Sequence, residues 1–420
     1  ETALDWSAWP GAAGGFQGAV EMCNNNGACR KLKGGVMCPS FRATRAERDT
    51  TRGRANTLRF AISGQMPGGL TSDAMAETMK LCVSCKGCRR ECPTGVDMAR
   101  MKIEVLAARR KERGLTLAET LVGFLPRYAP HAARLAPLMN LRNRLGPIRT
   151  LTEGITGLSA RRDLPVWSRD PFCDAEAQDA DPDLLLWADV FNRHFEPENL
   201  RAAIRVLRAS GFKVAVARDG TGRALDCGRT LLSVGCVDEA RAEIRRVISA
   251  TRGAVARGVP LVGLEPSSIL TFRDEALGLC PGAEAEALAR AAMTFEEVLA
   301  GRPDLPLGPL DRPIHVHGHC HQKAHDAVTP MLDLLRRIPG AEVHMIESGC
   351  CGMAGAFGYA PDTIDVSLKM AGLDLIPAIE AAPQDALIVA DGTSCRHQIA
   401  DGTPRRALHA ARVLDMALAT

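Results

Sequence analysis

Short apolar runs alternate with segments of helical periodicity through the second half of the chain. Apolar residues occupy positions 184–187, 213–216 and 260–264, and a helical pattern covers 200–209 between the first two runs. Strands that alternate with helices usually form a parallel sheet. This pattern therefore predicts an α/β domain with a mainly parallel sheet.

The same order of elements recurs from residue 311. Apolar runs at 314–316, 342–346 and 386–390 again indicate strands, and residues 331–338 have helical periodicity. A repeated order of elements is typical of an internal duplication. We therefore expect two similar repeats, over residues 183–300 and 311–420.

The first part of the chain has a different pattern. Residues 73–79 and 97–111 have helical periodicity and few β-branched residues, which predicts a helical domain over residues 1–115. Residues 116–182 form a proline-rich connector, and proline breaks long helices. The predicted fold class is therefore α+β and multidomain, with a helical domain followed by two α/β repeats.

Apolar residues inside the connector are flanked by arginines and form a partly amphipathic stretch. Its members are Leu121, Phe124, Leu125, Leu135, Leu138, Met139 and Leu141. We expect the stretch to pack on the protein's own core. Docking to a membrane surface or to a partner subunit is the alternative.

Length and composition indicate a soluble globular protein. A chain of 420 residues with 46% hydrophobic residues is long enough for two or three domains. No run of about 18 apolar residues and no charged-then-apolar leader occurs, so we expect neither a membrane span nor a signal-bearing precursor. The chain begins with Glu1 and not with Met, so we expect it to be a segment of a longer product.

The charge is uneven along the chain. Residues 1–170 carry 27 Lys and Arg against 15 Asp and Glu, whereas the remainder carries 25 against 34. An arginine-rich strip over residues 41–59 contains a single aromatic residue, Phe41, and its acidic residues interrupt the positive run. We expect these arginines to offset negative charge nearby, with partner docking as an alternative and no nucleic-acid partner.

Cysteine usage indicates the chemistry. The chain has 15 cysteines, and residues 82–93 read C-x2-C-x2-C-x3-C-P, the run that ferredoxin-type proteins use to hold 4Fe-4S clusters. Zinc sites usually use cysteine pairs separated by a longer stretch. Cys82, Cys85, Cys88 and Cys92 are therefore predicted iron ligands, which indicates one-electron transfer in a reducing, cytoplasmic compartment.

A second, incomplete run lies upstream. Cys23, Cys29 and Cys38 match the first, third and fourth positions, and Asn26 occupies the second. Crossed pairing would place Cys38 with Cys82, Cys85 and Cys88, and Cys92 with Cys23 and Cys29. Uncrossed pairing would keep Cys92 with the Cys82 run.

Either pairing leaves a site with three thiolates, and several possibilities for what this site binds remain open. The site would hold a 3Fe-4S cluster, a 4Fe-4S cluster with Asn26, water or another group on the fourth iron, or nothing. In a further alternative, Cys23 and Cys29 are ordinary small core residues.

A third set of cysteines lies in the second repeat. Aligning the repeats places residues 226–228 over 350–352 and residues 265–268 over 392–395. The second repeat then has four thiols, Cys320, Cys350, Cys351 and Cys395, whereas the first has only Cys227. Each of the four follows a predicted strand or sits in a glycine-containing loop, where the carboxyl ends of parallel strands converge.

These four thiols are predicted to hold an iron-sulfur centre. Adjacent cysteines such as Cys350 and Cys351 rarely form a disulfide with each other because the ring would be strained. A zinc ion or redox-active thiols, and unligated cysteines, are the alternatives. Five histidines surround Cys320, and among them His319 and His321 are the candidates to contact the cofactor.

The combined motifs resemble a known group of proteins. The Cys-Cys-Gly repeat with upstream ferredoxin runs is similar to the cysteine-rich domains of heterodisulfide reductase, the glycolate oxidase iron-sulfur subunit and anaerobic glycerol-3-phosphate dehydrogenase. Residues 37–47, 51–56 and 349–358 resemble more closely the C-terminal iron-sulfur half of FAD-linked D-2-hydroxyacid dehydrogenases, of the D-lactate and D-2-hydroxyglutarate type.

This resemblance implies an electron relay. In that family a flavin domain oxidises the hydroxyacid and passes electrons through the iron-sulfur half to a quinone or cytochrome. The chain has no flavin-binding domain and no G-x-G-x-x-G element, so we expect FAD only in a partner or upstream domain and no catalytic residue here. We expect cytoplasmic residence, with peripheral attachment to the inner membrane face as an open alternative.

A reductase is the alternative function. A relative of heterodisulfide reductase would reduce a disulfide or a quinone at the Cys350–Cys351 centre.

Overall fold

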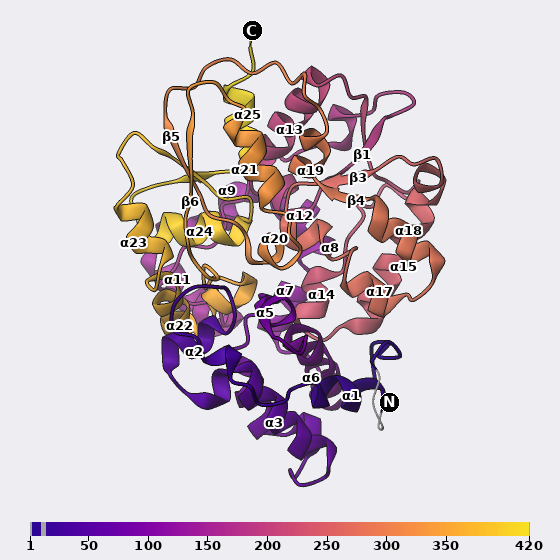
Figure 1. Ribbon diagram of the computed structural model, residues 1–420, viewed down its shortest axis with the longest axis vertical. Helices are drawn as coiled ribbons and strands as arrows, with labels where there is room; N and C mark the ends of the chain where they lie inside the picture. The colour runs from indigo at the N-terminus through magenta and orange to yellow at the C-terminus, as the bar shows by residue number, and fades with distance from the viewer. Residues whose placement is uncertain (1, 10–13, 420) are drawn as a thin grey trace.

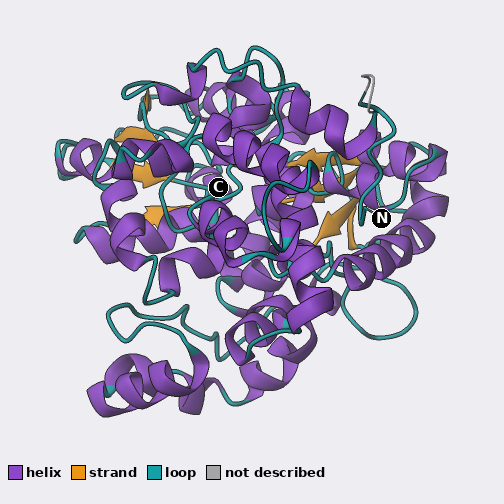
Figure 2. Ribbon diagram, turned by 90° about the horizontal axis from the view of Figure 1, so that it is seen from below, coloured by secondary structure: helices purple, strands orange, loops and turns teal. Residues whose placement is uncertain are grey.

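The computed structural model describes residues 2–9 and 14–419 (Figure 1). Helices enclose two small sheets that lie side by side, and the N-terminal helices form one end of the molecule (Figures 1 and 2). The predicted α+β fold class is confirmed. Among the described residues, no helix combines the length and the apolar character needed to cross a bilayer.

The N-terminal part is helical, as predicted. Its α-helices are α1 (Gly15–Glu21), α2 (Pro39–Thr44), α3 (Thr51–Ile62), α4 (Asp73–Lys80), α5 (Gly87–Glu91) and α6 (Met98–Arg113). Side chains of Thr50, Ser72 and Asp97 accept hydrogen bonds from the first free amides of α3, α4 and α6. Such caps satisfy N–H groups that have no partner within the helix, which explains where these helices begin.

The connector folds into five short helices. They are α7 (Leu117–Gly123), α8 (Leu125–Arg134), α9 (Ala136–Met139), α10 (Leu141–Arg144) and α11 (Gly146–Thr156). Pro126, Pro137 and Pro147 occupy the first turn of α8, α9 and α11, where a missing N–H costs nothing. Proline thus starts three of these helices, whereas Pro130 lies inside α8 and does not end it.

The first sheet is parallel throughout, in the order β2-β1-β3-β4. Its strands are β1 (Leu184–Trp187), β2 (Val214–Val216), β3 (Leu261–Gly263) and β4 (Ala292–Thr294). The accompanying helices are α12 (Val190–His194), α13 (Pro197–Ala209), α14 (Arg229–Ser233), α15 (Val237–Ala256), α16 (Pro266–Ile269), α17 (Glu275–Leu279), α18 (Ala283–Ala291) and α19 (Phe295–Ala300).

The second sheet has the equivalent order, β6-β5-β7-β8, and is also parallel. Its strands are β5 (Pro313–Val316), β6 (Glu342–Met345), β7 (Leu387–Val389) and β8 (Ala407–Leu408). Its helices are α20 (Cys320–Ala324), α21 (Thr329–Arg336), α22 (Ile364–Ala371), α23 (Leu375–Glu380), α24 (Thr393–Gly402) and α25 (Ala410–Met416). The fourth strand of each sheet, β4 and β8, was not predicted because neither is a distinct apolar run.

One apolar core joins the two repeats. Buried residues of α13 such as Leu207 belong to the same cluster as buried residues of α25 such as Leu414, and the cluster includes strands of both sheets. Since each sheet has only four short strands, the shared core holds the carboxyl ends of both sheets in a fixed relation.

Candidate metal centres

The run over residues 82–93 forms a tight turn followed by the short helix α5, and it lies between α4 and α6. Ser84 and Lys86 adopt left-handed backbone conformations, with φ of 50° and 59°. These turns direct successive cysteines toward one side. Burial raises the pKa of the Cys85 thiol, as do the neighbouring thiols of Cys320, Cys88 and Cys82. Cys82 and Cys88, two of the other three predicted ligands of this run, are therefore within electrostatic range of Cys85.

The loop is fastened to the upstream cysteine segment. The Glu91 carboxylate accepts hydrogen bonds from the amides of Val36 (2.7 Å) and Met37 (3.1 Å). The Cys85 thiol donates to the Val36 carbonyl at 3.7 Å. A Cβ atom at Gly87 would lie 2.8 Å from the Val36 carbonyl carbon, so only glycine permits this approach. Segments 36–38 and 85–91 are thus placed against each other.

Cys38 lies between the two predicted thiolate groups. Its Sγ accepts a hydrogen bond from the Thr51 amide at 3.1 Å. A hydrogen bond with Cys38 lowers the pKa of Cys29 to about 6, and it raises the pKa of Cys38. The Cys88 thiol is also within electrostatic range of Cys38. This position is compatible with crossed and with uncrossed pairing.

Asn26 does not extend toward the thiols. Its amide nitrogen donates to Asn24 Oδ1 at 2.6 Å, and its Oδ1 accepts from the Ala28 amide at 2.8 Å. Asn26 is exposed, whereas Cys23 and Cys29 are buried. The second motif position is therefore occupied by a residue that stabilises its own loop.

The four cysteines of the second repeat converge, as their order along the chain suggested. Cys320 begins α20 after β5, Cys350 and Cys351 follow β6, and Cys395 lies in α24 after β7. The Cys350 thiol is within electrostatic range of Cys320 and Cys351, and so is the Cys395 thiol. Interaction with Cys350 lowers the pKa of Cys320 to about 6. All four thiols thus gather at the carboxyl edge of one parallel sheet.

All four donors are thiols, which iron-sulfur clusters and structural zinc sites both use as ligands. Tetrahedral zinc with Zn–S bonds of about 2.3 Å brings its sulfur atoms to roughly 3.8 Å from one another. Among the described residues, one group of three His, Cys, Asp or Glu has its ligand atoms all within 4.8 Å, and it is Glu296, Asp391 and His409. No three cysteine thiols in the described part of the chain meet that limit. The donor set, thiolates alone, also fits iron and sulfide.

The histidines near Cys320 have different positions. His317 Nδ1 lies 2.8 Å from Ser348 Oγ, and its ring is within electrostatic range of the Cys351 thiol. His319 Nδ1 instead accepts the His321 amide at 3.1 Å and caps α20. His321 Nε2 lies 3.2 Å from the Ser84 carbonyl. The position of His317 near Cys351 was missed by the sequence analysis, although its place just after β5 could have suggested it.

The first repeat has no four-thiol site at the place that corresponds to these cysteines. Val190 begins α12 as Cys320 begins α20, and Ser268 occupies the same turn of α16 as Cys395 does of α24. Trp187 Nε1 donates to Ser268 Oγ (2.9 Å), which donates to Cys227 Sγ (3.1 Å). The lone thiol of Cys227 is therefore paired within the protein, and this set does not fit an iron-sulfur cluster.

The ferredoxin-like loop contacts the second-repeat centre directly. α5 lies beside α20 (Figure 1). The Cys85 and Cys320 thiols are within electrostatic range of each other, and the Ser84 carbonyl contacts His321. The Lys86 ammonium, which is buried, contacts Asp274 Oδ2 at 2.6 Å and Glu275 Oε1 at 2.7 Å. Two predicted centres that lie far apart in the sequence are thus neighbours.

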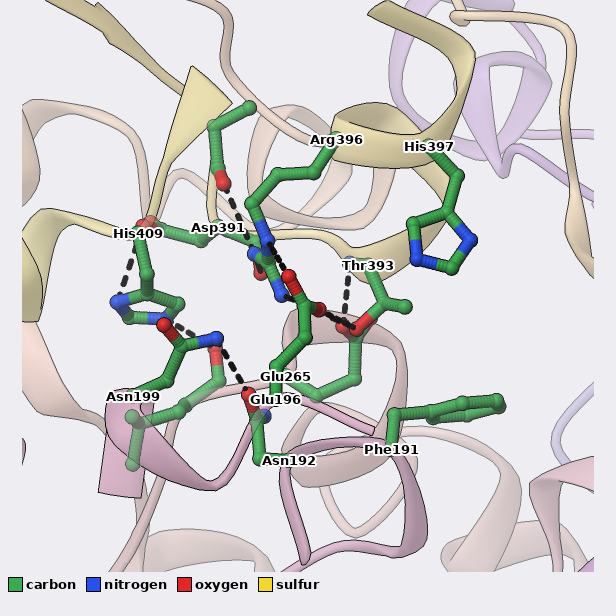
Figure 3. A network of polar contacts seen from close by, with 12 residues as sticks. Phe191, Asn192, Glu196, Asn199, Glu265, Asp391, Thr393, Arg396, His397 and His409 are labelled. Carbon is green, nitrogen blue, oxygen red and sulfur yellow. Dashed lines mark hydrogen bonds and ion pairs between the residues drawn. The ribbon is translucent and has the colours of Figure 1, made fainter. Parts of the chain in front are cut away.

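A polar network joins the repeats next to Cys395 (Figure 3). Arg396 forms an ion pair with Glu196 of the first repeat. The Thr393 amide donates to Glu265 Oε2 at 2.8 Å, and His409 Nε2 lies 3.1 Å from the Leu264 carbonyl. These contacts fix the start of α24, and therefore the backbone that carries Cys395, against the first repeat.

Comparison with known proteins agrees with this arrangement. Residues 19–96 match the family of the 4Fe-4S dicluster domain. One subunit of the anaerobic glycerol-3-phosphate dehydrogenase of Escherichia coli (strain K12) is 29% identical over 294 residues, which are 68% of this chain and 73% of that subunit.

The D-2-hydroxyglutarate dehydrogenase of Pseudomonas putida is 25% identical over an alignment that covers 95% of this chain and 43% of that enzyme. The D-2-hydroxyglutarate dehydrogenase of Escherichia coli (strain K12) is 22% identical, with 91% of this chain and 42% of that enzyme covered. The chain thus spans less than half the length of these two relatives. It carries a 4Fe-4S dicluster domain, is homologous to these dehydrogenase proteins, and is an iron-sulfur electron-transfer protein related to them.

Proposed function

We propose that the chain relays electrons from the FAD of a D-2-hydroxyacid dehydrogenase, of the D-lactate or D-2-hydroxyglutarate type, to a quinone or cytochrome acceptor. More than half the length of the two D-2-hydroxyglutarate dehydrogenases lies outside the match, which leaves room there for a flavin part. We propose that a separate subunit or an adjoining domain supplies that part here, and that the protein acts in the cytoplasm, attached peripherally to the inner membrane face.

The observation that carries the proposal is the contact between the Cys85 loop and α20. Clusters bound at these thiols would each accept and release one electron. We propose crossed ligation by Cys38, Cys82, Cys85 and Cys88, a second cluster at Cys23, Cys29 and Cys92, and a third centre at the four second-repeat thiols. Because Cys85 is close to Cys320, electrons would pass directly between the first and the third centre.

Residues around the thiols would bind and shield the centres. The Met98 amide donates to Cys88 Sγ at 3.4 Å, and the Gly352 amide donates to Cys350 Sγ at 3.5 Å. Cys85, Cys350 and Cys395 are buried, which excludes water from the sulfur atoms. Hydrogen bonds to sulfur and burial are the two means by which a protein adjusts the potential of such a group.

Metal analysis of single-cysteine variants tests the proposal. We expect anaerobically purified Cys85→Ser and Cys395→Ser each to lose about four irons per chain, with loss of a different EPR signal in each variant. Cys173→Ser is the matched control, since Cys173 is exposed and lies outside all three sets. An iron-free wild type, or equal loss in the Cys173 variant, would contradict the proposal.

Reduction of a disulfide substrate at Cys350 and Cys351 is not favoured. The two residues are 5% and 4% exposed, so a disulfide substrate has no access to their thiols.

A further inference from the structure

Large exposed apolar side chains are concentrated on the connector. Eight of the thirteen in the described residues lie between residues 117 and 166. We call them the connector face: Leu117, Leu135, Leu138, Met139, Leu145, Leu151, Ile155 and Val166. Leu138 and Leu151 are 62% and 64% exposed. Such a concentration on one short segment indicates a surface that something else covers.

Contacts between the short helices bring parts of this segment together. The Asn140 side chain bonds with the backbone of Trp167, which places Val166 near the end of α9. α10 packs on α11, and Gly157 at the end of α11 approaches Ala118 of α7. Leu151 and Ile155 are four residues apart on α11 and therefore share one side of that helix.

Basic residues outnumber acidic ones around this face: residues 117–166 contain seven arginines against Glu119, Glu153 and Asp163. Residues 120–152 contain five arginines and His131, and they contain no Asp or Glu. Arg134 and Arg144 are exposed, and among the described residues neither forms an ion pair. Each directly precedes an exposed leucine, Leu135 or Leu145. Apolar side chains bordered by unpaired arginines match a bilayer surface with negatively charged headgroups.

On its inner side, the connector contacts the rest of the protein through small residues. Ala129, Ala132, Ala133 and Ala136 pack against Trp167, so small residues already fill the contact with the body of the protein. The larger residues are left on the outside. Since no described helix is able to span a bilayer, attachment through this face would be peripheral.

We propose that the connector face docks this protein on an anionic lipid bilayer. Leucines of α9 and α11 enter the interface, while Arg134 and Arg144 contact lipid phosphates. This inference rests on the peripheral membrane location in the proposed function, and it assigns that attachment to the connector face. It is independent of the electron relay, because vesicle binding does not require that electrons pass through the clusters.

Co-sedimentation of the full chain with lipid vesicles tests this inference. We expect binding to phosphatidylcholine vesicles that contain phosphatidylglycerol, weaker binding to phosphatidylcholine alone, and loss of the difference at high salt. The double variant Leu138→Glu with Leu151→Glu should bind roughly 100-fold more weakly, at about tenfold or more for each leucine. Arg134→Gln and Arg144→Gln should each weaken binding to the anionic vesicles about fivefold.

A matched pair of substitutions serves as control. Phe60 and Met416 are both 51% exposed and lie outside the connector, so Phe60→Glu with Met416→Glu should bind like the wild type. Iron content reports whether each variant keeps its fold.

Three results would overturn the inference. They are absence of binding to anionic vesicles, equal binding by the Leu138 and Leu151 variant, and a wild-type dimer that this variant alone dissociates. The last result would assign the face to a second copy of the chain. Normal vesicle binding by an iron-free preparation would instead reject the proposed relay and leave this inference standing.

Discussion

Single residues determine how the thiols converge. Ser84 and Lys86 hold left-handed conformations that cost non-glycine residues about 1–2 kcal/mol each. Each also has a compensating contact, since the Ser84 carbonyl meets His321 and the Lys86 ammonium meets two carboxylates. The spacing of cysteines in the sequence indicated the metal chemistry, whereas the position of His317 within electrostatic range of Cys351 depends on where β5 and β6 end.

The ion pair between Glu196 and Arg396 should make stability depend on pH. Burial by itself would raise the pKa of Glu196, but Arg396 outweighs burial and lowers it to about 2 from 4.5. A lowered carboxyl pKa stabilises the fold above pH 4.5, and this contribution is lost as the pH falls toward about 2. Glu196→Gln should therefore cost about 3 kcal/mol at neutral pH.

Thermal unfolding at several pH values checks this expectation. The difference between wild type and Glu196→Gln should be full at neutral pH and should vanish in acid. Glu198→Gln is the control, because the Glu198 carboxylate is exposed and lies 3.7 Å from Arg205. A difference that persists unchanged in acid would contradict the assignment.

At the scale of elements, the four-thiol site is formed by the short segments that follow the strands of the second sheet. β5, β6 and β7 each end a few residues before a cysteine of the four-thiol set. Most strands of both sheets were predictable, because buried parallel strands are short apolar runs. β4 and β8 were not, because their two or three residues have no separate apolar pattern and their pairing depends on a neighbouring strand.

Glu91 at the end of α5 should be essential for joining the two ferredoxin-like segments. Its carboxylate accepts the amides of Val36 and Met37, so Glu91→Ala leaves two partly buried N–H groups without partners. We expect a loss of about 1–3 kcal/mol for each unpaired group. Iron should then be lost faster to a chelator than from the wild type.

Chelator-release kinetics measure this effect. Glu112→Ala removes an exposed glutamate from α6 and should release iron at the wild-type rate. If Glu91→Ala retained iron as firmly as this control, the carboxylate would have no part in holding the segments together.

At the scale of the whole molecule, buried charge joins the helical part to the first repeat. Lys86 and Asp274 are 2% and 6% exposed, and Arg89 also pairs with Asp274. The uneven charge along the sequence, positive before residue 170 and negative after it, thus appears in the fold as contacts between two parts. Such a pair stays favourable only while both partners are present.

Removing the ammonium should destabilise this junction. Lys86→Met leaves Asp274 and Glu275 with fewer cationic partners in a buried position, at a cost of about 3–5 kcal/mol. We expect a lower thermal midpoint and earlier proteolysis between the helical part and the first repeat. Lys80→Met, at a position that pairs with exposed Asp362, should leave both measurements near wild type. Equal effects of the two substitutions would contradict a special role for Lys86.

Local patterns in the chain were enough to indicate the chemistry and most elements, because thiolate spacing and apolar periodicity are properties of neighbouring residues. They predicted iron-sulfur ligation at residues 82–93, the duplicated α/β order and the helical first part. Folding in three dimensions was needed to bring Cys85 near Cys320, to place Cys38 between two thiol groups, and to turn the apolar side of the connector outward. These are contacts between segments up to hundreds of residues apart, and they depend on how helices and sheets pack, which no local pattern encodes.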